Sequence, residues 1–353
     1  MEIGITSFVE TKPDIHTGEV ISHAQRLREV VEEIVLADEI GLDVFGIGEH
    51  HRQDYAASSP AVVLSAAAPL TKRIKLTSAV SVLSSADPVR VFQDFATLDG
   101  LSNGRAEIIA GRGSFIESFP LFGYDLNDYD ELFEEHLELL LKIRESEKVT
   151  WNGEHRPAIN NLGIYPRPVQ NTLPIWIGSG GNTDSAIRAG LLGLPLMLAI
   201  IGGNPVQFAP LVQIYKKAAA HAGHDVSQLT VGSHSIGFIA DETEFAADTF
   251  FPSTQAGMNK IGKERGWSYY DRSSFDAARS FDGALYVGDP DIVAQKIIHL
   301  RKNVGITRFM MYVPLSTMPH DQVMRAIELL GTEVAPRVRD EIAKWEAEME
   351  GKQ

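Results

Sequence analysis

Residues 174–200 read PIWIGSGGNTDSAIRAGLLGLPLMLAI, and this stretch decides the fold class. Two short apolar runs, at 174–178 and 195–200, flank a segment at 184–192 whose pattern predicts a helix. The second run is almost entirely apolar, which is typical of a strand buried on both faces. Strand, helix and strand in this order predict two parallel strands joined by a right-handed crossover.

The same alternation extends over the whole chain. Strands are predicted at 3–8, 43–48, 74–83, 105–111, 174–178, 195–200, 230–240 and 308–313. Helices are predicted at 20–40, 60–70, 88–101, 128–145, 184–192, 206–222, 289–304 and 321–330, with Pro88 in a first helical turn and a charged tail at the end. Such a series closes as an α/β TIM barrel, although an open doubly wound sheet would produce similar local patterns.

Two segments interrupt this rhythm. Residues 146–172 are rich in Asn, Gly and Pro and predict a small hairpin or a long loop. Residues 245–285 look irregular and form the largest insertion, after the seventh strand. We therefore expect one TIM-barrel domain over 1–353, with 245–285 as a mobile lid in which Tyr269 and Tyr270 contact the barrel mouth.

Composition excludes several classes of function. The 353 residues include 32 basic and 47 acidic side chains, a net charge of −15 that disfavours binding to nucleic acid or to an anionic membrane surface. Cysteine is absent, which excludes disulfides, thiolate metal sites and cysteine nucleophiles. No signal peptide or membrane span is visible, and we expect a cytoplasmic location. The first strand lacks a His-x-His pair, so no metal site is expected.

Chemistry in a barrel of this kind is expected where strands end. Glu49-His50-His51 follows the second strand, and because side chains on a strand alternate, we expect one imidazole to face the site and the other to pack behind it. A ligand-facing imidazole would serve acid–base chemistry. The alternative is a structural pair that bonds to loop carbonyls.

Two loops after neighbouring strands are suited to an anion. Ser179-Gly180-Gly181-Asn182-Thr183 leads directly into a helix, whose first amides are unpaired donors. Gly111-Arg112-Gly113-Ser114 brings a permanently charged guanidinium. The alternatives are an ordinary Gly-rich turn with an Asn or Thr cap, and a surface salt bridge for Arg112. Neither loop matches the dinucleotide or P-loop motifs, which disfavours binding of dinucleotides or ATP.

Several short motifs in a fixed order resemble the bacterial luciferase-like flavin-dependent monooxygenases. They include Ala86-Asp87-Pro88-Val89-Arg90, Leu98 to Arg105, Gly111-Arg112-Gly113, Glu49-His50-His51, Pro166-Arg167-Pro168, residues 174–178, Gly288-Asp289-Pro290 and Gly305 to Phe309. The resemblance covers about residues 3–335. It implies a TIM barrel that binds reduced FMN and uses O₂ to oxygenate a small organic substrate, with a separate NAD(P)H:flavin reductase supplying the reduced flavin.

The resemblance also implies the site residues. His50 matches the family's active-site histidine and would act as a general acid or base. The flavin ring would lie beside a non-proline cis peptide at Ala79-Val80. Its phosphate would be held by Arg112, the Ser114 amide, Ser179, Asn182 and Thr183. Relatives pair through helices near 60–100, which implies a homodimer.

Luciferase proper has a cysteine where this chain has Gly111, and a carboxylate where it has Gly178. Glycine at the first position would leave room against the ring, and its presence favours the broader monooxygenase family. Two alternatives remain open. An F420-dependent oxidoreductase of the same fold would transfer hydride without oxygen, and a flavin-binding subunit would only stabilise a catalytic partner.

Overall fold

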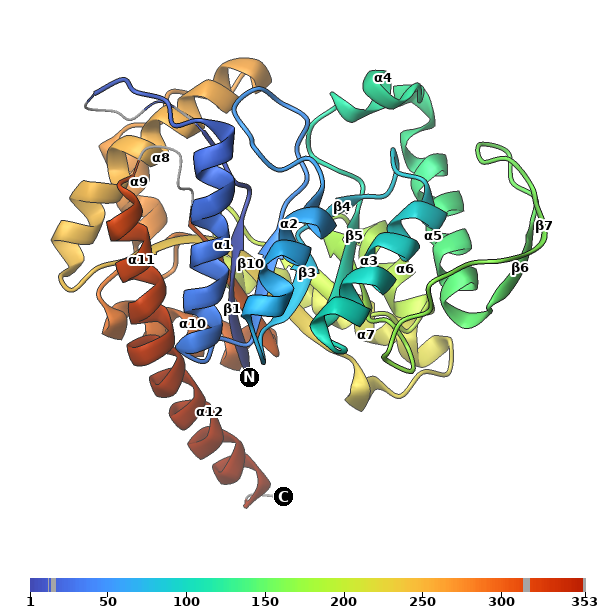
Figure 1. Ribbon diagram of the computed structural model, residues 1–353. Coiled ribbons are helices and arrows are strands. Elements are labelled where there is room, and N and C mark those ends of the chain that lie inside the picture. The colour runs from blue at the N-terminus through green and yellow to red at the C-terminus, as the bar shows by residue number, and fades with distance from the viewer. Residues whose placement is uncertain (12, 14–16, 314–317, 352–353) are drawn as a thin grey trace.

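The computed structural model describes residues 1–11, 13, 17–313 and 318–351, and it shows parallel strands enclosed by helices (Figure 1). The barrel strands, in order around the sheet, are β1 (Glu2–Ser7), β2 (Val44–Ile47), β3 (Lys75–Ser78), β5 (Ala106–Gly111), β8 (Ile175–Ser179), β9 (Leu196–Ala199), β10 (Val231–Ile239) and β12 (Arg308–Tyr312). Because β1 pairs with β2 on one side and with β12 on the other, the eight strands close. This confirms the TIM barrel and excludes the open sheet.

Helices lie outside the strands, as expected: α1 (His23–Glu39), α2 (Pro60–Ala67), α3 (Pro88–Ser102), α5 (Tyr129–Glu145), α6 (Thr183–Leu191), α7 (Ala209–His221), α10 (Pro290–Val304) and α11 (His320–Leu329). Local signals fix their ends. The Asp87 carboxylate accepts hydrogen bonds from the amides of Val89 and Arg90, at 2.9 and 3.1 Å, ahead of Pro88 in the first turn of α3. Asn103, at φ 57°, ends that helix.

The third predicted strand is interrupted. It was expected to be continuous over 74–83, but β3 ends at Ser78, and a two-residue strand, β4 (Ser81–Val82), then pairs with β5. A side chain replaces backbone pairing at the break. The Ser78 hydroxyl donates to the carbonyl of Ile109 and accepts from its amide, both at 3.1 Å. The ladder to β5 therefore continues while the chain turns toward the barrel mouth.

The hairpin predicted within 146–172 is confirmed, since β6 (Lys148–Trp151) and β7 (Ile159–Gly163) pair antiparallel. The short helix α4 (Ser118–Phe122) lies in the loop after β5.

The expectation of irregular structure over 245–285 was wrong. The segment forms α8 (Thr243–Arg265) and α9 (Arg272–Arg279) and leads to β11 (Tyr286–Gly288), which pairs with β10. Burial of Ala246, Ala247 and Phe250 stabilises α8 although Pro252 lies inside it. The charged tail is also helical: α12 (Ala335–Glu350) follows a π-helical turn at Leu330–Val334.

The barrel interior is filled in layers. Val44, Ile109, Trp176, Met197 and Met310 form an apolar cluster in the middle. Beneath it, Arg308 donates two hydrogen bonds to the Glu107 carboxylate, at 2.7 and 3.2 Å, and lies 4.2 Å over the Trp176 ring. Arg308 is 1% exposed and also pairs with Glu2 at 2.6 Å. This ion-paired plug occupies the N-terminal end of the barrel, so the accessible end is the one where strands finish.

Within the described ranges, no helix combines the length and the apolar character needed to cross a bilayer.

Candidate active site

The side of the barrel mouth formed by β2, β5 and β8 is lined by very small residues. A cis peptide joins Ala79 to Val80, as the resemblance implied. A Cβ atom added to Gly46 would lie 2.9 Å from Ala79 Cβ, and one added to Gly111 would lie 2.5 Å from Val80 Cγ2. One added to Gly178 would approach Val80 Cγ1 to 3.0 Å. Three strands therefore require glycine to accommodate this dipeptide.

This geometry corrects the interpretation of Gly111. The absence of a side chain at Gly111 was expected to leave room for a ring, but Val80 fills the space beside it. The glycines bring Ala79 and Val80 against the barrel wall, and both residues remain partly exposed there. The surface available to a flat ligand is therefore formed by Ala79 and Val80 together with the backbone of the neighbouring strands.

The two adjacent histidines have different surroundings, as their alternation predicted. The His50 ring contacts Phe8, Tyr55 and Phe115, with centroids 4.7, 4.4 and 5.1 Å away. His51 instead bonds to Glu49 at 2.8 Å, and the other oxygen of that carboxylate accepts from the Val82 amide at 2.9 Å.

His50 therefore lies in an aromatic environment, while Glu49 ties His51 to β4. His50 and Ser114 line one small pocket between the loops that follow β2 and β5. The structure thus brings these two predicted site residues together.

Arg112 points toward α5. Its guanidinium pairs with Asp130 and lies 5.4 Å over the Tyr129 ring, while the Tyr129 hydroxyl donates to the Gly113 carbonyl at 2.8 Å. One helical turn further, Arg188 of α6 pairs with Glu134. The loop after β5 and the helix after β8 are thus tied to the same face of α5, although Arg112 itself is engaged by a carboxylate.

The glycine-rich loop after β8 has the Asn cap that was considered as the alternative to an anion site. The Asn182 side chain caps α6 by accepting from the amides of Asp184 and Ser185, at 2.7 and 3.2 Å. The Ser179 hydroxyl accepts from the Gly181 amide at 3.3 Å. Gly180, Gly181 and Thr183 are exposed. The interpretation of Asn182 as a helix cap is therefore confirmed. Because the amides of Gly181, Asp184 and Ser185 already have partners, the role of this loop as an anion site beside β5 stays a prediction.

Another side of the mouth is aromatic, and the sequence did not predict it. Phe8 directly follows β1, and His234 and Tyr312 lie on the neighbouring strands β10 and β12. Phe8 and Tyr312 stack with centroids 4.3 Å apart, and His234 lies 5.7 Å from Phe8 and 5.6 Å from Tyr312. We call these three rings the aromatic wall. The signal available in the sequence was His234 itself, an ionisable residue inside a predicted strand.

Buried polar groups support the aromatic wall. The Tyr312 hydroxyl donates to the Glu10 carboxylate, and burial together with that carboxylate raises the pKa of Tyr312 well above its ordinary value. Burial lowers the pKa of His234 from 6.5 to about 4. Val9, between Phe8 and Glu10 in the chain, has a φ of 55°, a strained conformation for a β-branched residue. The wall therefore carries no charge at neutral pH.

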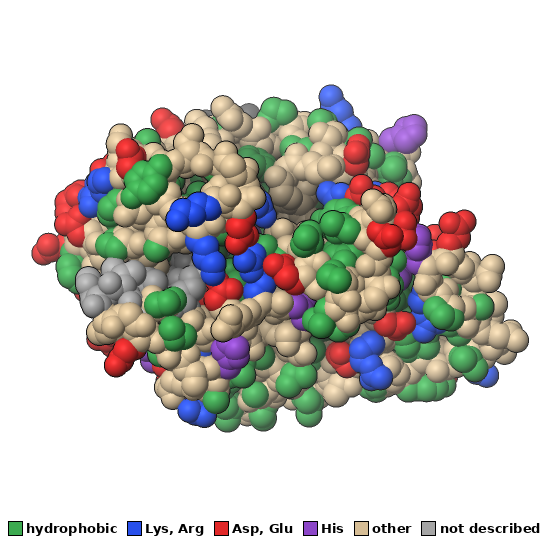
Figure 2. Space-filling model, turned by 90° about the horizontal axis from the view of Figure 1, so that it is seen from above, with side chains coloured by type: hydrophobic (Ala, Val, Ile, Leu, Met, Phe, Trp, Pro, Cys, Tyr) green, Lys and Arg blue, Asp and Glu red, His purple; other side chains and the backbone are tan. Residues whose placement is uncertain are grey.

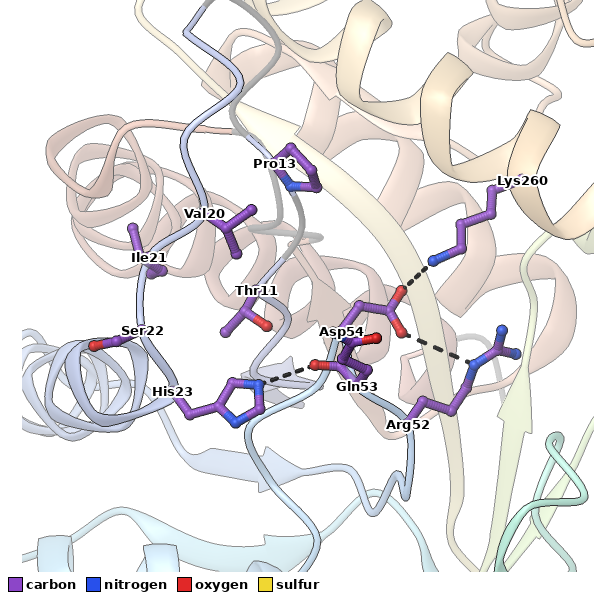
Figure 3. A pocket seen from close by; sticks show the side chains of 10 residues that line it. All are labelled: Thr11, Pro13, Val20, Ile21, Ser22, His23, Arg52, Gln53, Asp54 and Lys260. Carbon is purple, nitrogen blue, oxygen red and sulfur yellow. Dashed lines mark hydrogen bonds and ion pairs between the residues drawn. The ribbon is translucent and has the colours of Figure 1, made fainter.

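Charged residues form the outer edge of the mouth. A pocket of about 630 Å³ between α8 and the segments near residues 20 and 52 is lined by Thr11, Pro13, Val20, Ile21, Ser22, His23, Arg52, Gln53, Asp54 and Lys260 (Figure 3). Lys260 pairs with Asp54 at 2.7 Å, and Arg52 pairs with Glu264 at 2.9 Å. Figure 2 shows basic and acidic side chains side by side near the centre of this face.

These ion pairs therefore connect helix α8 to the loop that follows β2 at the mouth. Arg265 adds a hydrogen bond to the Ser114 carbonyl at 3.1 Å. Tyr269 and Tyr270 were expected to contact the mouth. The Tyr269 side chain is 72% exposed, and the side chain of Asn259 on α8 forms hydrogen bonds with the backbone of Tyr270. The described residues contain no group of His, Cys, Asp or Glu side chains arranged to hold a metal ion.

A sequence model of the family described as luciferase-like monooxygenase matches residues 1–308. Protein y4vJ of Sinorhizobium fredii is 25% identical over 92% of this chain and 95% of that protein. The alkanal monooxygenase alpha chain of the Kryptophanaron alfredi symbiont is 27% identical over 57% of each chain. An F420-dependent glucose-6-phosphate dehydrogenase of Amycolatopsis mediterranei is 30% identical over 44% of this chain and 48% of that enzyme.

Solved structures share the fold. Monooxygenase RslO1 from Streptomyces bottropensis superposes with a TM-score of 0.80 at 22% identity, covering 95% of this chain and 99% of that one. The oxygenating constituent of 3,6-diketocamphane monooxygenase from Pseudomonas putida, in complex with FMN, gives a TM-score of 0.73 at 22% identity, covering 96% and 99%. At this identity the likeness shows the fold alone.

Proposed function

Because the chain belongs to the luciferase-like monooxygenase family, we propose that this oxidoreductase uses reduced FMN to insert one oxygen atom of O₂ into a small organic substrate. A separate NAD(P)H:flavin reductase would deliver the reduced flavin. The observation that carries the proposal is the glycine-lined surface at Ala79 and Val80, placed next to two loops with anion-binding groups.

Neighbouring parts of one side of the mouth suit the two ends of FMN. Ala79 and Val80 are partly exposed and present apolar side chains against which a tricyclic ring would lie. Arg112, the Ser114 amide, Ser179, Asn182 and Thr183 would hold the phosphate, with Asn182 acting through the helix that it caps. When bound, reduced FMN would supply the two electrons that oxygen activation requires.

His50 would hold or move the proton that the reaction needs. Its ring lies among Phe8, Tyr55 and Phe115, which keep bulk water away from it. It lines the same pocket as Ser114, so an acid–base group and a phosphate-binding loop border one space. Helix α8, fastened by Arg52 and Lys260, would act as the lid that completes this enclosure.

The proposal is tested by single turnover under ¹⁸O₂ with protein-bound, chemically reduced FMN and a panel of aldehydes, ketones, sulfonates and heterocycles. The expected result is a product that gains one ¹⁸O atom, detected by mass spectrometry. A panel without labelled product, despite tight FMN binding, would refute the oxygenase assignment.

The second candidate is an F420-dependent oxidoreductase, which the relative from Amycolatopsis mediterranei brings into consideration. Arg112 and the loop after β8 suit a single terminal phosphate and favour FMN. Parallel titrations with FMN and F420 separate the two, because tighter binding of F420 together with hydride transfer to substrate would establish the second.

We also propose a homodimer. Val62, Leu70 and Leu101, in or beside α2 and α3, are 70, 58 and 56% exposed, and a second copy of the chain would cover these apolar side chains. Sedimentation velocity tests this, and a monomer at micromolar concentration would contradict it.

A further inference from the structure

We propose that the substrate is an uncharged molecule with a planar aromatic ring, which stacks on the aromatic wall formed by Phe8, His234 and Tyr312. The inference rests on the proposed function, because it assigns the other side of the same mouth to the second reactant.

The first argument is the geometry of the three rings. Their planes are nearly parallel, with angles of 19° between Phe8 and His234, 21° between His234 and Tyr312, and 30° between Phe8 and Tyr312. Phe8 and His234 are partly exposed, whereas Tyr312 is 7% exposed and lies buried beside them. Parallel, accessible rings can take a further ring in an offset stack.

The second argument is charge. His234 is neutral at physiological pH, and the Tyr312 hydroxyl is directed to Glu10, so the wall offers ring surfaces and not an ion. Arg52 and Lys260, two cations at the outer edge of the mouth, are already paired with Glu264 and Asp54. A charged substrate would lose its hydration against this wall without gaining a counter-ion.

The third argument is the asymmetry of the mouth. Gly111 and Gly178, on β5 and β8, remove side chains from a part of the barrel surface that lies away from the wall. A ring on that side meets backbone and small side chains, whereas a ring on the aromatic side meets other rings. His50 touches Phe8 edge-on, with centroids 4.7 Å apart, and therefore borders the space next to the wall.

The experiment compares two ketones with the same number of carbon atoms. Acetophenone and cyclohexyl methyl ketone are titrated calorimetrically into the protein loaded with oxidised FMN, which holds the site occupied without turnover, and benzoate serves as a charged probe. An aromatic pair raises affinity about 2- to 12-fold beyond the effect of the buried surface area, equivalent to ~0.5–1.5 kcal/mol. We expect acetophenone to bind tighter than the cyclohexyl ketone by such a factor, and benzoate to bind more weakly than either.

Phe8→Leu and His234→Leu should each reduce the preference for acetophenone toward unity, while Phe8→Tyr should keep it. Phe281→Leu is the matched control, because Phe281 is 48% exposed and makes a similar edge contact with a histidine, His299, at 5.0 Å. FMN affinity is measured separately by fluorescence, and thermal melting verifies folding.

Equal affinity for the two ketones, tighter binding of benzoate, no detectable binding of either ketone, or a preference that survives both leucine variants would overturn the inference. A loss of FMN affinity in Phe8→Leu would also overturn it, because the wall would then serve the cofactor. If the protein binds no FMN but still prefers acetophenone, the inference stands and the proposed function fails.

Discussion

Replacing Arg112 by glutamine should weaken FMN binding while leaving riboflavin binding unchanged, because the two ligands differ by the phosphate. A charge-assisted hydrogen bond contributes about 1.5–3 kcal/mol, which corresponds to roughly 10- to 150-fold in the dissociation constant. Arg112 is 25% exposed, so the lower half of that range is the more realistic expectation.

The partner of Arg112 supplies the opposite test. Asp130 is 68% exposed and engages the same guanidinium that the phosphate would need. A surface pair of this kind contributes about 0.2–1 kcal/mol. Asp130→Asn should therefore tighten FMN binding by about 1.4- to 5-fold, since the phosphate no longer competes with a carboxylate.

The structure offers a matched control in Arg188→Gln. Arg188 pairs with Glu134 on the next turn of α5 and lies 5.6 Å over the Phe133 ring, much as Arg112 lies over Tyr129. Fluorescence titrations of FMN and riboflavin at two salt concentrations provide the assay, because a phosphate contact weakens as ionic strength rises. Equal effects of Arg112→Gln on both flavins, or an equal effect of Arg188→Gln on FMN, would refute the assignment of the phosphate site.

Three further predictions concern the mouth. His50→Ala should lower turnover by about 10²- to 10⁴-fold, the usual contribution of a general acid or base, with FMN affinity retained. Gly111→Ala should destabilise the fold by about 1–3 kcal/mol in urea titrations, because the added methyl would lie 2.5 Å from Val80. The third prediction concerns pH. The folded pKa of His234, about 4, lies below its ordinary value of 6.5, so the unfolded chain takes up a proton first as pH falls. The wild type should lose stability relative to His234→Leu by up to ~1.4 kcal/mol per pH unit between pH 6.5 and 4, and show no such difference above pH 7.

Each of these predictions has a result that contradicts it. Unchanged turnover in His50→Ala would remove His50 from the chemistry. If Gly111→Ala unfolds at the same urea concentration as the wild type, Val80 moves aside without loss of stability. Parallel pH–stability curves for the wild type and His234→Leu would show that the imidazole titrates normally in the folded protein.

The barrel was predictable because its strands are short apolar runs between helices with clear start and stop signals. Asp87 before Pro88 and Asn103 at the end of α3 are local signals that need no tertiary information. The break at Ser78 was not predictable in this way, since it depends on a bond between its hydroxyl and Ile109 on another strand.

Helix α8 escaped prediction for a related reason. Its glycines and Pro252 are local signals for irregular structure, and burial of Phe250 against the barrel outweighs them.

The residues of the candidate site were likewise predictable only in part. His50, Arg112 and the loop after β8 belong to contiguous motifs, so a resemblance could identify them. The aromatic wall joins Phe8, His234 and Tyr312, which are far apart in the chain and meet only because β10, β12 and β1 are neighbours. The engagement of Arg112 by Asp130 was likewise invisible, because it depends on where α5 packs.

The plug of Arg308, Glu107 and Trp176 makes the barrel a blind-ended tube. Any organic reactant that reaches the interior must enter and leave on the side where α8 lies. A molecule bound at this opening therefore obstructs both the entry and the departure of any other ligand, because the opposite end of the barrel offers no second route.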